Sequence, residues 1–205
     1  MASMNGSEST KVIKRGKPRK TNTLGDETIK DLICAAKCVL ARDGASGFTL
    51  DRIAKQAQVT KGTLLYHFRN KDNLLSLLTD DYIEHLQRNL DDGIDAARAS
   101  LRYSKRVDPV VAGFMEWYKS FRSKDESYTT YGLTLLTLLA NNETQRIKIR
   151  KWYENLFFQL RQSTCKDALK IVLLLEGLFY LKHFNLDVTS DEEIDSLLHE
   201  MELLL

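Results

Sequence analysis

A chain of 205 residues with 43% hydrophobic and 28% charged residues can bury a core of its own without metals or disulfides. Three cysteines exclude a disulfide framework, and the longest apolar stretch, Ile171 to Leu181, is interrupted by Glu176 and too short to cross a bilayer. The net charge is only +2, but residues 1–25 hold six lysines and arginines against one glutamate, whereas residues 80–205 hold sixteen against twenty-one acidic residues. We therefore expect a soluble cytoplasmic protein that approaches a polyanion with its N-terminal third.

Residues 1–25 are polar and then basic and have no apolar period, which predicts a disordered basic arm. They also lack the apolar core of a signal peptide. From Asp26 onward apolar residues recur at helical spacing, and Gly44 is expected to end this first helix.

Two short helices follow, and each has a clear start. Thr49 is a good N-cap, and Phe48 before it and Ile53 after it form a hydrophobic staple. Thr60 repeats this arrangement only a few residues after the first helix ends. Two short helices with so tight a connection predict a helix-turn-helix that spans roughly Thr49 to His67.

The rest of the chain also shows helical patterns only. Asn70 caps a long fourth helix, and Asp108-Pro109 starts another after a polar linker. Further helices are predicted over residues 109–122, 126–140, 143–163, 166–185 and 191–204, the last with a capping box at Ser190 and Glu193. The predicted fold is all-α with about nine helices, in three parts: a basic arm (1–25), a three-helix domain that contains the helix-turn-helix (26–80) and a helical C-terminal domain (81–205).

In a helix-turn-helix the second helix lies in the major groove. Its core anchors here would be Leu64 and Phe68, which places four side chains on the outer side as candidate phosphate or base contacts: Lys61, Thr63, Tyr66 and His67.

Three residues are unfavourable choices for a free helix. Lys61 and Lys71 each occupy a first helical position, where the macrodipole disfavours a cation, and Gly62 weakens the first turn. A phosphate backbone would neutralise both lysines and approach closest where a Cβ is missing. The alternative is that surface positions tolerate such mild costs.

Together these residues resemble a known family. The spacing from Ala35-Ala36 through Gly44, Ile53-Ala54, Tyr66-His67-Phe68 and Lys71 is similar to that of the N-terminal domain of the TetR family. The resemblance implies a homodimer that binds a palindromic operator in double-stranded DNA, as a repressor in most relatives. It also implies a helical C-terminal domain that dimerises and binds a small-molecule inducer that releases the DNA.

Carried over by position, the family's recognition contacts fall on Thr60, Lys61, Thr63, Tyr66 and His67, beside Gly62. A backbone-contacting cap falls on Thr49 and a phosphate contact on Lys71. One residue departs from the pattern: relatives commonly have a tyrosine where this chain has Leu65, which cannot bind a phosphate. The basic arm either reaches a minor groove, as in some relatives, or is a solvated tail.

Beyond about residue 90 the sequence is rich in aromatic residues, which are typical both of a core and of a ligand pocket. Candidate ligand-binding residues are Trp117, Phe121, Tyr131, Glu176, Tyr180 and His183. Glu176, Tyr180 and His183 share one helical face, where the carboxylate needs a partner: His183, another helix, a dimer contact or a ligand cation. The resemblance implies that helices 166–185 and 191–204 form the dimer contact, with leucines on their apolar faces.

Other classes of function receive little support. We find no nucleophile–base motif, phosphate loop or metal signature, so we expect no enzyme activity, no cofactor and no metal. Cys34 and Cys38 lie one turn apart with no nearby histidine, which is a poor zinc signal. The remaining alternative is a helical dimer that binds a ligand or protein but has no operator.

Overall fold

The computed structural model describes residues 23–103, 107–122, 127–184, 186 and 188–205. Within these ranges it contains nine helices and no strand: α1 (Thr23–Gly47), α2 (Leu50–Gln56), α3 (Lys61–Phe68), α4 (Lys71–Ala99), α5 (Pro109–Arg122), α6 (Ser127–Leu139), α7 (Glu143–Arg161), α8 (Ala168–His183) and α9 (Asp191–Leu203). The all-α prediction is confirmed. The predicted basic arm falls almost wholly outside the described residues.

The predicted caps set the starts of these helices. Thr49 accepts the backbone N–H of Arg52, and Thr60 accepts that of Thr63 at 3.0 Å. Asn70 does the same for Asn73 at 2.8 Å, and Ser190 forms the predicted capping box. Each bond satisfies an N–H that the first helical turn leaves without an intrahelical partner.

Helix ends differ slightly from the sequence prediction. Gly44 has a φ of 70°, which breaks α1 where expected, although a further turn continues to Gly47. At the start of α8, the N–H of Ala168 bonds the carbonyl of Cys165, so residues 165–167 form a turn and not the first helical residues. Such shifts arise because the ends of helices carry the weakest periodic signal.

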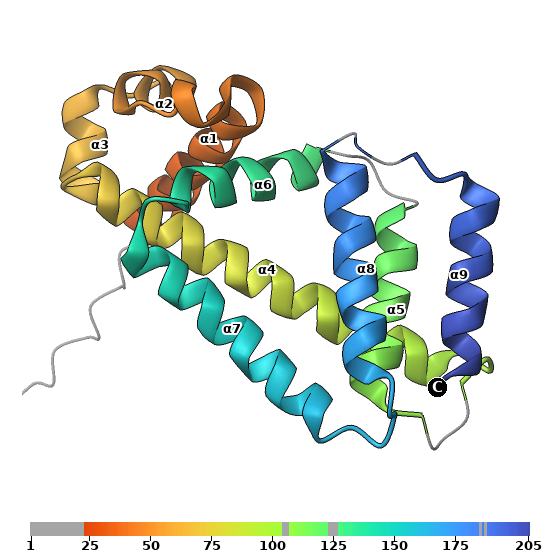
Figure 1. Cartoon of the computed structure of the whole chain (residues 1–205). Coiled ribbons are helices and arrows are strands. Elements are labelled where there is room, and N and C mark those ends of the chain that lie inside the picture. The colour runs from red at the N-terminus through yellow and green to blue at the C-terminus, as the bar shows by residue number, and fades with distance from the viewer. Residues whose placement is uncertain (1–22, 104–106, 123–126, 185, 187) are drawn as a thin grey trace, which may run out of the picture.

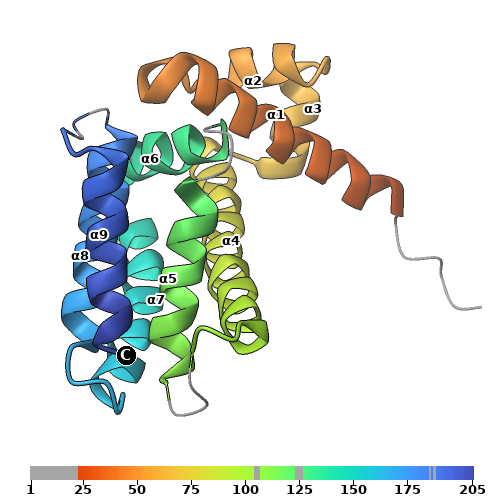
Figure 2. The ribbon, with the colours of Figure 1, turned by 90° about the vertical axis from the view of Figure 1, so that its right-hand side faces the viewer.

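The helices form two regions (Figures 1 and 2). Helices α1, α2 and α3 lie together at one end, and α4 runs from them into a bundle, where α5 and α7 pack against α4 and α8 packs against α5 and α7. Helix α9 lies at the edge of the bundle away from α4, and α6 crosses the top. Helix α4 continues through residue 80, where the sequence analysis divides the domains, so both regions share it.

Helices α4 and α5 approach each other closely at Gly93 and Gly113. A Cβ built on Gly93 would lie 2.2 Å from the backbone oxygen of Gly113, so only glycine allows this crossing. The two helices therefore form a tightly packed pair in the bundle.

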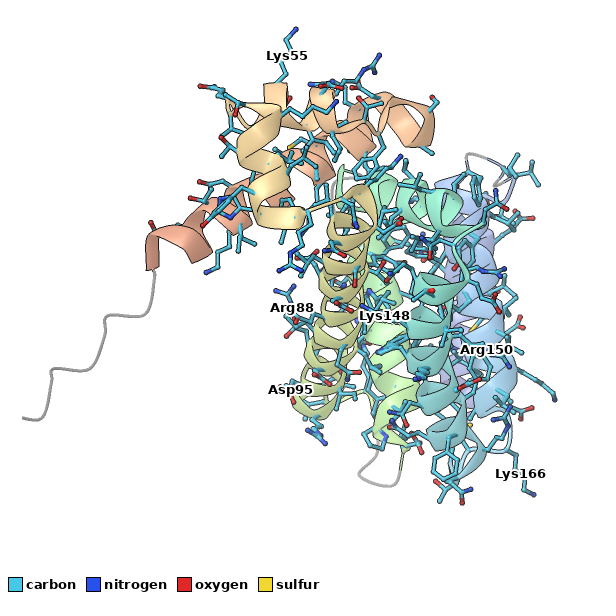
Figure 3. The ribbon with its side chains drawn as sticks, turned by 90° about the vertical axis from the view of Figure 1, so that its left-hand side faces the viewer. Lys55, Arg88, Asp95, Lys148, Arg150 and Lys166 are labelled. Carbon is cyan, nitrogen blue, oxygen red and sulfur yellow. The ribbon has the colours of Figure 1, made fainter. Side chains whose placement is uncertain are left out.

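Three contacts connect α4 to its neighbours near the N-terminal region. Lys37 of α1 pairs with Asp81, and the hydroxyl of Tyr131 on α6 donates to the Leu78 carbonyl at 3.0 Å. Lys148 of α7 donates to Asp80 at 2.7 Å (Figure 3). Within the described helices, none is long and apolar enough to cross a membrane.

Candidate DNA-binding surface and ligand cavity

Helix α3 has one buried and one free face. Leu64 and Phe68 are buried, which confirms both as core anchors. Lys61, Gly62 and Tyr66 are exposed, and the Tyr66 side chain is 83% accessible. The Tyr66 side chain therefore presents both an aromatic ring and a hydroxyl to the solvent on this face.

Two threonines shape the start of this helix. The hydroxyls of Thr60 and Thr63 lie 2.9 Å apart, and Thr60 also caps the helix. Thr63 and His67 are half-buried, and the His67 ring meets the Tyr66 ring edge-on at 5.3 Å. The polar side chains on the outer face therefore hold one another before any partner binds.

The two lysines have partners within the chain. Lys61 pairs with Asp51 of α2 at 2.9 Å, and the Lys71 ammonium lies 5.2 Å from the centre of the Phe48 ring. The cost inferred from the helix macrodipole is thus offset internally, and the cost alone no longer requires a phosphate. Both side chains remain accessible enough to exchange these partners, because Lys61 is exposed and Lys71 half-buried.

Gly62 has no structural reason to be glycine. A Cβ built on it would meet only the Thr60 hydroxyl oxygen, at 3.6 Å, which is an ordinary van der Waals contact. The backbone is helical here, so no positive φ favours glycine. The residue leaves the surface of the first turn of α3 bare.

A cavity lies within the bundle, between α4, α5, α7 and α8. Its walls are mainly aromatic, with Glu176 and two leucines: Tyr82, Leu86, Phe114, Trp117, Tyr118, Phe121, Tyr153, Leu175, Glu176 and Phe179. The hydroxyl of Tyr153 donates to Glu176 at 3.2 Å. Burial raises the pKa of Glu176 to about 7, against the lowering effect of this hydrogen bond.

The candidate ligand residues separate in space. Trp117, Phe121 and Glu176 line the cavity, and Tyr180 lies within hydrogen-bond reach of Tyr153 beside it. Tyr131 lies outside the cavity walls, in the buried junction of α4 and α6, where its ring meets the Tyr82 ring at 6.4 Å. The side chain of the remaining candidate, His183, lies outside the described residues.

The profile of the bacterial regulatory proteins of the tetR family matches residues 32–78, which contain α2, α3 and most of α1. This N-terminal segment of the chain therefore resembles the tetR-family domain. Over 57 residues it is 42% identical to the HTH-type transcriptional regulator SrpR of Pseudomonas putida, and over 58 residues 36% identical to AcrR of Shigella flexneri. Each match covers 28% of this chain and only 27% of the relative.

Solved structures show that the fold extends over the rest of the chain. A putative TetR-family regulator from Rhodococcus sp. aligns with 86% of this chain and 97% of its own at a TM-score of 0.64 and 16% identity. The multidrug binding protein EbrR, solved with imidazole, aligns with 87% and 90% at 0.60 and 19% identity. NalD, the secondary repressor of the MexAB-OprM efflux pump in Pseudomonas aeruginosa, aligns with 87% and 96% at 0.54 and 18% identity.

Two further basic residues, which the sequence analysis did not single out, are exposed in the region of α1 to α3. Lys55 of α2 projects from the end of the domain away from the bundle (Figure 3). Arg69, just after α3, is also exposed. Counting every lysine and arginine in or next to the predicted helix-turn-helix would have found both residues in the sequence.

Helices α8 and α9 differ in what they leave exposed. Leu173, Leu174 and Leu181 of α8 are 56%, 43% and 44% accessible and surround the exposed Gly177. The α9 residues Ile194, Leu198 and Met201 are instead buried in the chain's own core.

Charged groups also fasten α9 to α5. Lys119 of α5 binds Glu202, and Arg122 of α5 binds Asp191 and Asp195. The apolar face of α9, which the family resemblance assigns to the dimer contact, thus packs against helices of its own protomer.

Cys34 and Cys38 are both exposed on α1. Loss of some of its hydration, together with the neighbouring Cys34, raises the pKa of the Cys38 thiol, which disfavours a reactive thiolate. Among the described residues, no cluster of three or more potential metal ligands is present.

Proposed function

We propose that this protein is a homodimeric transcriptional repressor that binds palindromic operator DNA through α3 and is released from it by a small-molecule inducer. The carrying observation is the free face of α3: Tyr66 is exposed, Lys61 is accessible, and Gly62 is bare although the fold has room for a side chain. Such a surface allows close approach of a phosphate backbone, and the tetR-family domain supports this reading.

The proposed contacts have different tasks. Lys61, Tyr66 and His67 would meet bases or phosphates in the major groove, with Thr60, Thr63 and Thr49 at the helix starts. Lys71 would contact a phosphate, and Lys55 and Arg69 add positive charge on the same domain.

The dimer is proposed to form through α8, with α9 beside it. Three exposed leucines around Gly177 form an apolar strip on α8. Two copies of α8 can pack closely on this strip, because a Cβ built on Gly177 would meet no side chain or other helix within 4 Å. Leu181→Glu should therefore give monomers in light scattering at micromolar concentration, whereas Phe158→Glu, on the exposed face of α7, should leave dimers. A wild-type monomer would contradict the proposal.

Release requires a connection between cavity and DNA-binding domain. Tyr82 lines the cavity, its ring meets Tyr131 of α6, and the Lys37 ammonium of α1 lies 5.5 Å from the centre of the Tyr131 ring. Lys37 also pairs with Asp81, next to Tyr82. A ligand that displaces Tyr82 would thus disturb the contacts that hold α1 against α4 and α6. This supports coupling between the cavity and the DNA-binding domain through packed side chains.

The test is DNA binding by the full chain. We expect a gel shift on the DNA upstream of its own gene, with affinity that falls steeply with salt. Lys71→Ala should weaken binding to all sequences and reduce the log–log salt slope by about one unit. Lys166→Ala, an exposed lysine at the far end of the bundle, is the matched control and should change nothing (Figure 3).

An unchanged slope in the Lys71 variant would remove that residue from the contacts. A wild-type dimer without any salt-dependent DNA binding would contradict the proposed function and favour a helical ligand- or protein-binding module.

A further inference from the structure

The cavity in the bundle has an unusual combination of walls and charge. Seven of the ten residues that line it are aromatic, two are leucines, and the tenth is Glu176, whose carboxyl group titrates near neutral pH. The aromatic rings come from four helices, so several of their faces and edges converge on one small space.

Glu176 has no counter-charge in the described part of the chain. Its carboxylate accepts a hydrogen bond from the Tyr153 hydroxyl. No ion pair joins it to any lysine, arginine or histidine whose side chain the structure describes. A carboxylate in such a setting is costly unless a cation or several donors reach it. A glutamine would satisfy one tyrosine hydroxyl equally well, so the hydrogen bond alone does not explain an acid here.

We propose that the cavity binds an organic monocation that carries an aromatic ring, with Glu176 as its counter-charge and the surrounding rings as cation–π partners. The walls would attract the cation through the negative faces of their rings, and burial would strengthen this attraction. An anionic ligand would meet the carboxylate without a compensating cation, and a neutral one would gain nothing from it. The link to release from DNA rests on the function proposed above, whereas the binding itself does not.

The cavity must open to admit such a ligand. In this conformation the cavity volume is only about 20 Å³, which is room for about one water molecule. The rings of Phe121 on α5 and Phe179 on α8 lie 4.6 Å apart across it. Entry of a ligand therefore separates α5 from α8 and pushes on Tyr82 of α4, the residue that leads to α1.

Cation binding is also linked to a proton. The other titratable groups facing Glu176 are Tyr82 of α4, Tyr118 of α5, Tyr153 of α7 and Tyr180 of α8. Burial and the nearby Glu176 raise the pKa of both Tyr153 and Tyr180, so these two hydroxyls stay neutral between pH 5.5 and 8.5. Below its raised pKa, Glu176 is protonated and must release that proton to the solvent when a cation binds. Affinity for the cation should therefore rise up to tenfold per pH unit below about pH 7 and level off above it.

A pair of probes of the same shape tests this directly. Phenyltrimethylammonium and tert-butylbenzene differ only in a positive nitrogen in place of a carbon. With the DNA-free protein at pH 8.5, we expect the cation to bind at least tenfold more tightly, as measured by calorimetry and by quenching of tryptophan fluorescence, and to lose most of this preference at pH 5.5.

Glu176→Gln should abolish both the preference and its pH dependence while leaving tert-butylbenzene binding within twofold of wild type. Glu154→Gln, which removes an exposed carboxylate one residue from Tyr153, is the matched control and should retain both. Thermal unfolding of each variant shows whether it is folded.

Three results would overturn the proposal: equal affinity for the two probes, a cation preference that survives in Glu176→Gln, or no binding of either probe to the wild type. Gel shifts of the same samples test the regulatory function separately. Cation binding that leaves the DNA complex intact would refute inducer release and keep the cation site, whereas DNA binding without cation binding would do the reverse.

Discussion

Replacing Gly62 by alanine should separate folding from DNA binding. The added carbon would lie 3.6 Å from the Thr60 hydroxyl oxygen and touch nothing else, so the domain accepts it without strain. Alanine favours the helix over glycine by up to about 1 kcal/mol, which in a chain of this size raises Tm by about 2–4 °C. We therefore expect a folded protein that is slightly more stable than the wild type.

The same methyl group would hold the first turn of α3 away from a phosphate backbone. Loss of one such contact, with its charge-assisted hydrogen bonds, costs about 1.4 kcal/mol, or about tenfold in Kd. Fluorescence anisotropy on the upstream DNA at fixed salt measures this. Thr137→Ala, a comparable small gain in helix propensity at an exposed site on α6, serves as control and should leave Kd unchanged. Wild-type affinity in the Gly62 variant, or a clear loss of its stability, would refute the reasoning.

Three further outcomes test the packing. Gly93→Ala places a carbon 2.2 Å from the backbone oxygen of Gly113 and must push α4 from α5, so denaturant unfolding should show a loss of about 1–3 kcal/mol; an unchanged midpoint would contradict that crossing. Gln58 has a φ of 56°, so Gln58→Gly should stabilise the protein by up to about 1 kcal/mol in thermal melts, and a fall in Tm would show that the glutamine side chain matters more than its backbone. Because burial raises the pKa of Glu176 from an ordinary 4.5 to about 7, the folded state binds its proton more tightly than the unfolded state, and stability contributed by this group is lost as pH rises from about 4.5 to about 7. Allowing for its partial exposure, Glu176→Gln should be about 2 kcal/mol more stable than wild type at pH 8.5 and nearly equal at pH 4.5, at one protein concentration; a constant difference across pH would refute the burial argument.

Local chemistry explains why so much of the helical layout could be predicted. Thr49, Thr60 and Asn70 each accept an N–H three residues along the chain, and Ser190 exchanges bonds with Glu193 over the same span. Such bonds depend on neighbours in sequence, so residue order alone reveals them. The buried anchors Leu64 and Phe68 follow from the helical period in the same way.

The site residues divide along this line. The free face of α3 follows from period and caps, whereas the partners of Lys61 and Lys71 are Asp51 and Phe48, on other elements. The cavity depends still more on tertiary packing. Trp117 and Phe121 fall within it, but Tyr131, an equally plausible aromatic residue in sequence, packs against Leu78 and Tyr82 outside it.

The sequence by itself determined that the chain forms helices, where the capped helices α2, α3, α4 and α9 start, and which face of α3 packs into the core. These properties depend on hydrogen bonds and side-chain periods within a few residues. Only the tertiary structure decided that Glu176 lines one cavity with seven aromatic residues, that α9 packs its apolar face into its own protomer, and that α8 keeps three of its leucines exposed. Those outcomes depend on how helices far apart in sequence cross, and Gly93 against Gly113 shows that one missing Cβ can fix such a crossing.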